Sequence, residues 1–314
     1  MPEDQETWED KFLMFATAKG GVRRNKLSVF GSIRSNGLIA MKLEEKDDEL
    51  ISVRVCDEEQ DILLSTNDGR AIRFKVTDVR CFNSRNSTGV RGIRLDTNKN
   101  KVISMSILNH IEASSDERTD YLKYRNAEKR GENPSLDDYE NLNQDKYEEM
   151  LEKDQTLLVT TTKGYGMKAS IHGYRITNRG GKGISNMQVD DRNGEIVSSF
   201  IVEEDSQIIL VTNNGQMIRT AVDTIRQTSR NSKGVKVFTI KDKENVISVA
   251  HIPNNEEEEL CACGCNPEEC ECPPTCECGC NSPKVDDEKT VEVMSDEIVV
   301  DEVAEVSAEE EKSE

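Results

Sequence analysis

The sequence predicts an all-β fold of the propeller type, made of about four repeats of roughly 50 residues each. Two polar, basic segments, residues 84–95 and 229–240, are close copies of one another. Four apolar runs are each followed by a glycine-containing turn and a second β-rich run. Only 35% of the 314 residues are hydrophobic, so part of the chain is expected to lie outside any core. These features favour a repeated β-array over a sandwich.

Each repeat is expected to begin with a β-hairpin. The apolar first strands cover residues 12–17, 62–66, 157–160 and 208–212. The turns that follow them contain Gly20, Gly69, Gly164 and Gly215. A glycine after Asn-Asp or Lys supplies the positive φ that a tight hairpin needs. Basic residues, among them Arg73 and Arg219, end the return strands.

A second glycine and a last strand complete each repeat. The second glycines are Gly37, Gly89, Gly183 and Gly234, which follow the hairpin glycines by 17 to 20 residues. The last strands are expected at residues 50–53, 102–105, 196–199 and 246–249. The predicted blades, each of about four strands, cover residues 12–56, 60–109, 156–204 and 206–253 of a β-domain that spans 12–255. The pattern leaves open whether four blades close into a ring, stay open or are incomplete.

Three acidic segments surround the repeats: a leader at residues 1–11, an insert at 110–155 and a tail that we place at 256–314. The insert has 14 acids and 7 bases, and residues 251–314 have 21 acids and 3 bases. Without these two segments and the first ten residues, the repeats carry a net charge of +10, although the whole chain carries −20. The basic body therefore indicates a polyanionic partner.

The insert and the tail have different compositions. A helix is predicted from Ser135, as its N-cap, to Lys153 within the insert. The insert is then either a solvated excursion between blades or an arm that docks another protein. After Pro253 the repeat period is lost, and the composition of the tail predicts disorder.

Several function classes find no support in the sequence. No run of about 18 apolar residues indicates a membrane span, and the first residues are acidic rather than those of a signal peptide. The ten cysteines are confined mostly to the tail, which favours a reducing cytoplasm over a disulfide-stapled secreted fold. His110, His172 and His251 are scattered, and no phosphate-binding GxxxxGK[ST] loop occurs. We therefore predict no catalytic residue and no cofactor for the repeats.

Basic side chains recur beside the second glycines, where neighbouring Ser and Asn residues add neutral donors. Repetition of blades would bring these cations round one rim, where they can neutralise phosphates along a duplex. The predicted DNA-binding residues are Arg34, Arg73, Arg85, Arg91, Arg94, Arg179, Lys182, Arg219, Arg230, Lys233 and Lys236.

Eight cysteines gather in the tail: Cys261, Cys263, Cys265, Cys270, Cys272, Cys276, Cys278 and Cys280. Repeated Cys-x-Cys pairs bring several thiolates within reach of one soft metal ion such as Zn²⁺. The alternative is a redox-sensitive or merely biased tail. Cys56 and Cys81 stand in or beside predicted strands, and we expect them to be core residues or surface residues without a functional role.

Three segments carry a resemblance to a known family: Thr-Gly-Val-Arg-Gly-Ile-Arg-Leu at 88–95, Thr-Asn-Asp-Gly-Arg-Ala-Ile-Arg-Phe at 66–74, and Asn-Arg-Gly-Gly-Lys-Gly at 178–183. They resemble the C-terminal β-pinwheel domain of gyrase A, the cleavage subunit of DNA gyrase, with the topoisomerase IV domain as close kin. The third segment resembles the family's QRRGGKG box. It departs from the box at Thr177-Asn178, and it lies in the third repeat rather than the first blade.

The resemblance implies a domain that wraps double-stranded DNA round a basic rim. Its implied partners are a gyrase A cleavage core and a gyrase B ATPase subunit, in a heterotetramer at the bacterial nucleoid. By blade order the chain resembles the last four of the family's six blades, and so a fragment without the catalytic tyrosine domain or the ATP site. The alternatives are a topoisomerase IV-type domain, or a protein-interaction propeller with a metal-binding tail.

Overall fold

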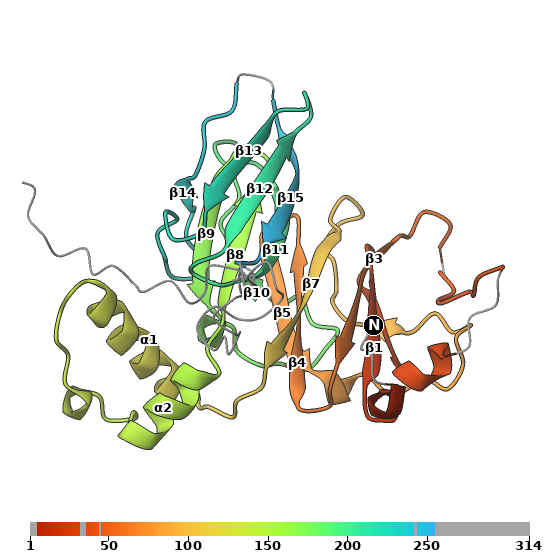
Figure 1. Cartoon of the computed structure of the whole chain (residues 1–314), viewed down its shortest axis with the longest axis horizontal. Coiled ribbons are helices and arrows are strands. Elements are labelled where there is room, and N and C mark those ends of the chain that lie inside the picture. The colour runs from red at the N-terminus through yellow and green to blue at the C-terminus, as the bar shows by residue number, and fades with distance from the viewer. Residues whose placement is uncertain (1–4, 32–35, 44, 242–243, 255–314) are drawn as a thin grey trace, which may run out of the picture. The chain divides into compact units, whose positions relative to one another are not determined.

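The computed structural model describes residues 5–31, 36–43, 45–241 and 244–254 (Figure 1). Arg34, the eight clustered cysteines and the predicted disordered tail lie outside the described residues. Within them, four antiparallel sheets follow one another along the chain. The predicted propeller-like, all-β architecture is therefore confirmed.

In each sheet the innermost strand is the last strand of its repeat, and the other strands follow outwards from it. The first sheet is β3 (Leu50–Cys56), β1 (Phe12–Thr17), β2 (Gly21–Lys26) and β6 (Val90–Arg91). The second is β7 (Val102–Asn109), β4 (Gln60–Thr66), β5 (Arg70–Lys75) and β10 (Ile184–Ser185). The third is β11 (Ile196–Val202), β8 (Thr156–Thr161), β9 (Tyr165–Ser170) and β14 (Val235–Lys236), and the fourth is β15 (Val246–Ile252), β12 (Gln207–Thr212) and β13 (Met217–Ala221).

The core lies between neighbouring sheets. Successive side chains of a strand point to opposite faces, so Ile62 and Leu64 pack towards the first blade while Leu63 packs towards the third. Leu157 and Leu158 divide in the same way between the second and fourth blades. Because both faces of the middle sheets are covered, these first strands are continuous apolar runs rather than alternating ones.

The outermost strand of each four-stranded sheet comes from the next repeat. β6 belongs to the second repeat but pairs with β2, β10 pairs with β5, and β14 pairs with β9. The sequence predicted four strands for every repeat, and the structure shows that one of them completes the preceding sheet. The fourth sheet has three strands among the described residues, where β13 receives no outer strand.

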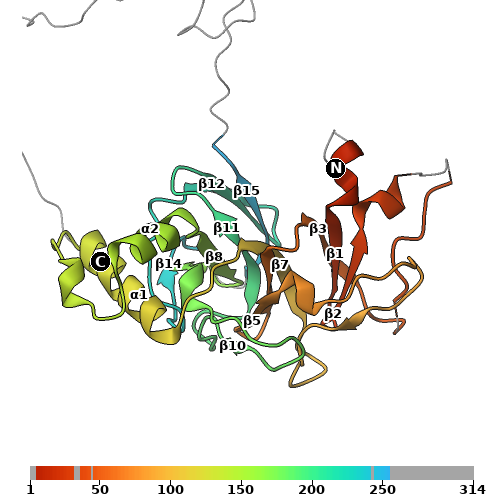
Figure 2. The same ribbon diagram turned by 90° about the horizontal axis from the view of Figure 1, so that it is seen from below.

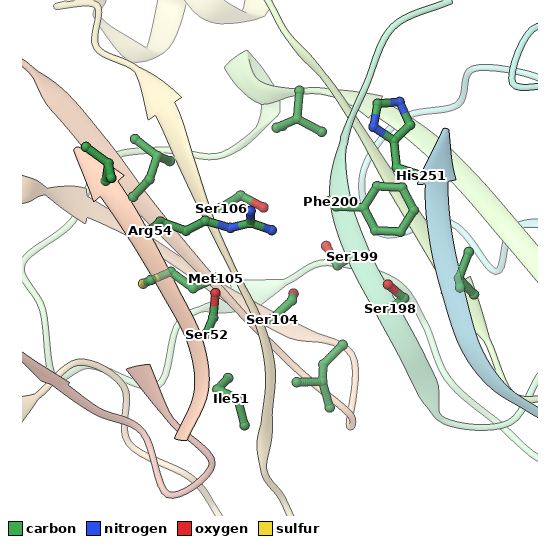
Figure 3. Close-up of a pocket in the computed structure, with 15 residues that line it drawn as sticks. Ile51, Ser52, Arg54, Ser104, Met105, Ser106, Ser198, Ser199, Phe200 and His251 are labelled. Atoms are coloured by element: carbon green, nitrogen blue, oxygen red, sulfur yellow. The ribbon is translucent and has the colours of Figure 1, made fainter. Parts of the chain in front are cut away.

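The donated strands β6, β10 and β14 thus form the rim, while the last strands of the repeats form the centre. β3, β7, β11 and β15 line a central cavity of about 670 Å³. Figure 3 shows Arg54 on β3 pointing towards Ser106 on β7, with Phe200 and His251 beside one another on the other side. The ring centroids of Phe200 and His251 are 5.8 Å apart.

The acidic insert contains α1 (Ser115–Lys129) and α2 (Gln144–Glu152), which lie to the side of the sheets in both views (Figures 1 and 2). The helix predicted from Ser135 to Lys153 is confirmed only in its second half, as α2, and its predicted start and N-cap are wrong. Ser135 caps only the short 3₁₀ turn η4 (Leu136–Asp138), and Asn143 caps α2. The helix α1 was missed, although Ser114 and Glu117 form a capping box that the sequence displays.

The insert is anchored to the third blade. Tyr121 of α1 is fully buried, and its ring centroid lies 4.9 Å from that of His172 in η5 (Ile171–Gly173). The Tyr121 hydroxyl donates to Asp154, which also accepts a hydrogen bond from Ser170 on β9. The insert therefore has a small core of its own that is joined to the β-domain by buried polar contacts.

A basic side chain near the end of the return strand is a buried structural element in three of the four described blades. Arg24, Arg73 and Lys168 occupy this position in the first three blades, and each is at most 6% exposed. The backbone carbonyl of each accepts a hydrogen bond of 2.8 Å from the following repeat, at Phe82, Thr177 and Thr228 respectively. We call these three residues the interblade staple.

Arg73 was predicted to contact DNA, and that prediction is wrong because its guanidinium is in the interior. Its Nε and Nη2 atoms lie 2.9 and 2.8 Å from the carboxylate of Asp61, which is fully buried. It also donates to the carbonyls of Ile171 and Asn109, each at 2.9 Å. Burial lowers the pKa of Arg73, and the Asp61 carboxylate opposes that shift. The ion pair thus lies within the second blade, and the hydrogen bond to the Ile171 carbonyl joins that blade to the third.

Replacing Arg73 with Gln should destabilise the domain by about 3–5 kcal/mol, because it leaves the Asp61 carboxylate buried without its charge partner. Arg219→Gln is the matched control, since Arg219 holds the same position in the fourth blade but is exposed. It should change stability by no more than about 0.5 kcal/mol. Urea unfolding followed by circular dichroism measures the free energy of unfolding of both variants. Equal losses of stability in the two variants would contradict a structural role for Arg73 in the interblade staple.

Candidate nucleic-acid interface

The donated strands carry exposed cations on the rim of the domain. Arg91 in β6 and Lys236 in β14 stand two residues after their glycines and are exposed. Ser185 in β10 takes the equivalent position of the third repeat. Arg94 is also exposed, three residues beyond Arg91. The side chains of Arg91, Arg94 and Lys236 have no ion pair or hydrogen bond within the described part of the chain, so they are available to an anion.

Two lysines on the rim pair with acids of the preceding repeat. Lys182 and Lys233 each stand one residue before a second glycine, and their Nζ atoms lie 2.6 Å from Asp96 and Asp190 respectively. These contacts lower the pKa of both carboxyls. The two lysine side chains remain 55% and 54% exposed. Since exposed ion pairs contribute little stability, both lysines can exchange their partners for phosphate at small cost.

Arg179 and Arg230 hold the backbone instead. Arg179 donates from Nε to the carbonyl of Asp78 at 2.9 Å and from Nη1 to that of Arg91 at 3.0 Å. Arg230 makes the equivalent pair with Gly173 at 2.9 Å and Ser185 at 2.7 Å. Each thus ties its segment to the turn and rim strand of the neighbouring repeat. Their positive charge adds to the rim, but two donors of each guanidinium are occupied by backbone carbonyls.

The segment that resembles the family box, in the third repeat, contacts the donated segment of the second repeat. The amide of Gly180 donates to the carbonyl of Gly92 at 2.6 Å, and the amide of Arg94 donates to that of Gly181 at 2.8 Å. Gly180 and Gly183 both have positive φ, at 81° and 72°, which favours glycine at these positions. In this chain the segment therefore shapes the rim between two neighbouring donated strands.

A further set of exposed arginines was missed by the sequence reasoning. Arg80, Arg175 and Arg226 stand eight or nine residues before the second glycines, and all three are exposed. The guanidinium of Arg80 lies 4.4 Å from the centroid of the Phe82 ring. Aligning the repeats on the second glycine would have found the set, because it recurs at nearly the same spacing in three repeats.

The two remaining described residues that were predicted to bind DNA, Arg85 and Arg219, differ in their exposure to solvent. Arg85 is half-buried, and its carbonyl accepts a hydrogen bond from Arg23. Arg219 is exposed and donates to Gln207. The structure thus brings Arg91, Arg94, Lys182, Lys233 and Lys236 to the rim as accessible cations. It places Arg73 in the interior, and it occupies Arg179 and Arg230 with backbone carbonyls.

Other kinds of site find no support in the described residues. No group of three or more His, Cys, Asp or Glu side chains within them is arranged to hold a metal ion. None of their helices is long and apolar enough to cross a membrane. Cys56 is buried, and burial raises the pKa of its thiol to about 12, which fits a core residue. His172 is buried, and His110 lies 2.9 Å from the Asp61 carboxylate.

The chain resembles known proteins over the four blades. Relatives include the gyrase A proteins of Rickettsia prowazekii (strain Madrid E), 42% identical over 264 residues, and of Staphylococcus aureus (strain MRSA252), 33% identical over 251 residues. These matches cover 82% and 80% of this chain but only 29% and 23% of the relatives. The chain thus spans less than a third of the length of either relative.

Two solved structures share the fold. The C-terminal domain of DNA topoisomerase IV superposes with a TM-score of 0.60 at 18% identity, covering 80% of this chain and 64% of that one. The DNA gyrase A C-terminal domain superposes with a TM-score of 0.57 at 20% identity, covering 78% and 66%. The family model of the DNA gyrase C-terminal domain, a β-propeller, matches residues 11–57, 60–109, 155–203 and 206–253. Since these four matches take up more than half of the sequence, the chain belongs to the DNA gyrase C-terminal domain family.

Proposed function

We propose that the chain binds double-stranded DNA along its rim, as a domain of a type IIA topoisomerase. The observation that carries the proposal is that accessible cations recur in or beside the donated strands. Arg91 and Lys236 share one repeat position, Lys182 and Lys233 share another, and Arg94 lies three residues beyond Arg91. The exposed Arg80, Arg175 and Arg226 extend the same series. Regular spacing of positive charge along a curved edge suits the regular phosphates of a duplex.

The binding is expected to be tolerant of DNA sequence. Lysine and arginine contacts to phosphates fix the position of the duplex but carry no direct base information. The repeats contribute a net charge of +10, which supports attraction of a polyanion despite the −20 of the whole chain. The rim would hold the DNA in a curved path, and we assign the wrapping function of the resembled family to this path.

The partners and the place of action follow from the family as proposals. We infer that the domain works beside a gyrase A cleavage core and a gyrase B ATPase subunit in a bacterial cytoplasm, at the nucleoid. Catalysis would reside in those partners. A protein-interaction role of the acidic insert is the competing candidate. It would be favoured if the folded chain failed to bind duplex DNA at low salt.

Substitution of Arg91, Arg94 and Lys236 together by Gln should weaken binding by a similar factor on DNA of different sequences. The slope of log affinity against log salt should fall by roughly 0.9 for each lost phosphate contact. Arg54→Gln is the control, because Arg54 is exposed but lines the central cavity rather than the rim. Fluorescence anisotropy over a salt series measures both, and a salt slope unaltered by the triple substitution would refute the rim site.

The acidic tail supports a second prediction. Residues 251–314 have a net charge of −18, which can compete with DNA for the +10 of the repeats. Removing residues 256–314 should therefore tighten DNA binding at low salt, with a smaller difference at high salt because screening weakens the competition. The same anisotropy assay decides it, since equal affinities of the truncated and complete chains at low salt would exclude tail competition.

The eight clustered cysteines support a metal proposal for the tail, which lies outside the described residues. Thiolates in Cys-x-Cys spacing suit Zn²⁺, and eight of them suffice for two tetrahedral sites. Chain purified with reductant should contain Zn²⁺ by elemental analysis, and deletion of residues 256–314 should abolish the signal. Metal-free protein that takes up no added Zn²⁺ would instead favour a redox-sensitive or merely biased tail.

A further inference from the structure

A second pocket lies where the acidic insert leaves the second blade and packs beside the third. Its volume is about 260 Å³, and β5, the first residues of the insert, α1 and the turn η5 all contribute to its lining. Ile111, Tyr174 and Ile176 supply apolar walls. His172 also lines the pocket, and burial lowers the pKa of its imidazole, so this ring carries no charge at neutral pH. The charge of the pocket therefore depends on its arginine, lysine and glutamate side chains.

Two of the cations that line the pocket are balanced by carboxylates. Arg73 pairs with the buried Asp61, and its remaining donors go to backbone carbonyls. Lys75 pairs with Glu112, which also lies 3.2 Å from His110. These contacts lower the pKa of Glu112, so its carboxylate stays ionised and neutralises Lys75. Glu112 is the only acid among the described residues that line the pocket.

Arg118 is the cation that remains without a counter-charge. It is half-buried in the first turns of α1, and its Nε donates to the carbonyl of Ser114 in the same helix at 3.2 Å. No carboxylate of the described chain forms an ion pair with its guanidinium. Burial lowers the pKa of Arg118, and the positive charges of Arg73, Arg175 and Arg230 add to that shift. The pocket thus presents a half-buried guanidinium that is surrounded by like charges.

The other bases of the insert differ from Arg118. Five of them pair with acids of the insert itself, namely Lys123, Arg125, Arg130, Lys146 and Lys153. Lys129 instead donates to Gln227 of the fourth repeat. Lys129 and Arg118 are eleven residues apart, which is close to three turns of a helix, so they lie on the same side of α1. The acidic insert therefore turns the two bases without a carboxylate partner towards the basic repeats.

The pocket also lies next to cations of the rim. Arg175 is exposed and belongs to the series that includes Arg80 and Arg226. Arg230 holds the carbonyl of Ser185 on the rim strand β10. Both charges act on the guanidinium of Arg118, so an anion in the pocket is attracted by all three arginines. The planar fork of an arginine matches two oxygens of a phosphate, and partial burial strengthens the attraction.

We propose that Arg118 binds a phosphate group in this pocket, and that a duplex lying along the rim supplies it. The source of the phosphate rests on the proposed DNA binding, whereas the anion site itself rests on the pocket and its charges. The insert is then part of the DNA surface in spite of its net negative charge. It would fix the position of the duplex where the DNA passes the third blade.

Arg118→Gln tests the site in the complete chain. Binding of a labelled duplex at about 0.1 M salt should weaken roughly fivefold to tenfold, and the slope of log affinity against log salt should fall by about 0.9. Lys123→Gln is the matched control, because it removes the same charge from α1 at a position that pairs with Asp120. It should leave the slope unchanged. Arg118→Lys should restore the slope, since it returns the charge, and this recovery separates a lost contact from a misfolded insert.

Inorganic phosphate, titrated without DNA at constant ionic strength, tests the pocket separately. The Nε–H resonance of Arg118 in the nitrogen NMR spectrum is assigned by its loss in Arg118→Gln. It should shift with phosphate and saturate in the millimolar range, which corresponds to roughly 4 kcal/mol of binding free energy. Lys123→Gln should show the same shift, because its side chain does not line the pocket.

The two measurements separate the sources of the phosphate. A saturable NMR shift together with equal DNA binding by Arg118→Gln and Lys123→Gln would keep the phosphate site but refute its occupation by DNA. Failure of the unaltered chain to bind duplex would refute the proposed function, and the phosphate titration would still decide the pocket. No saturable shift, with no difference between the two variants in DNA binding, would overturn the inference.

Discussion

The fold depends on a blade being unable to complete its own sheet. A twisted sheet buried on both faces still exposes the amides and carbonyls of its outer strand, which is costly to leave unpaired in a packed array. The chain resolves this by sending a short segment of each repeat back to the preceding blade, where β6, β10 and β14 form the rim. Each junction is thereby fixed by backbone pairing as well as by the apolar core between the sheets.

Strand exchange also explains why basic residues have two separate roles. On the return strands of the first three blades, Arg24, Arg73 and Lys168 are buried where the next repeat packs, as Arg73 is beside Asp61. Cations on the donated strands lie on the outside with no covering element, as Arg91 and Lys236 do. Arg179 and Arg230 stand between the two groups and hold the backbone turns together. The DNA surface that we propose is therefore made by the same segments that close the sheets.

Much of the architecture could be predicted because it is encoded locally. Glycines at positive φ, such as Gly69, and continuous apolar runs, such as Phe12–Thr17, identify the hairpins in their correct order. The destination of a donated strand could not be predicted, because Val90 and Arg91 show the same pattern whichever sheet they join. The burial of Arg73 depends on a carboxylate twelve residues away and on carbonyls of another blade, so composition near a glycine did not reveal it. In the insert, the cap at Asn143 outweighed the one predicted at Ser135.

The central claim is that the donated strands form the DNA surface while the inner strands do not. Hydrogen exchange of the complete chain with and without a duplex, followed by mass spectrometry, tests it most directly. Bound DNA should slow amide exchange in peptides that contain β6, β10 and β14, and leave β3, β7 and β11 unchanged. Slowed exchange confined to the inner strands or to α1 and α2, with none on the rim, would contradict the account.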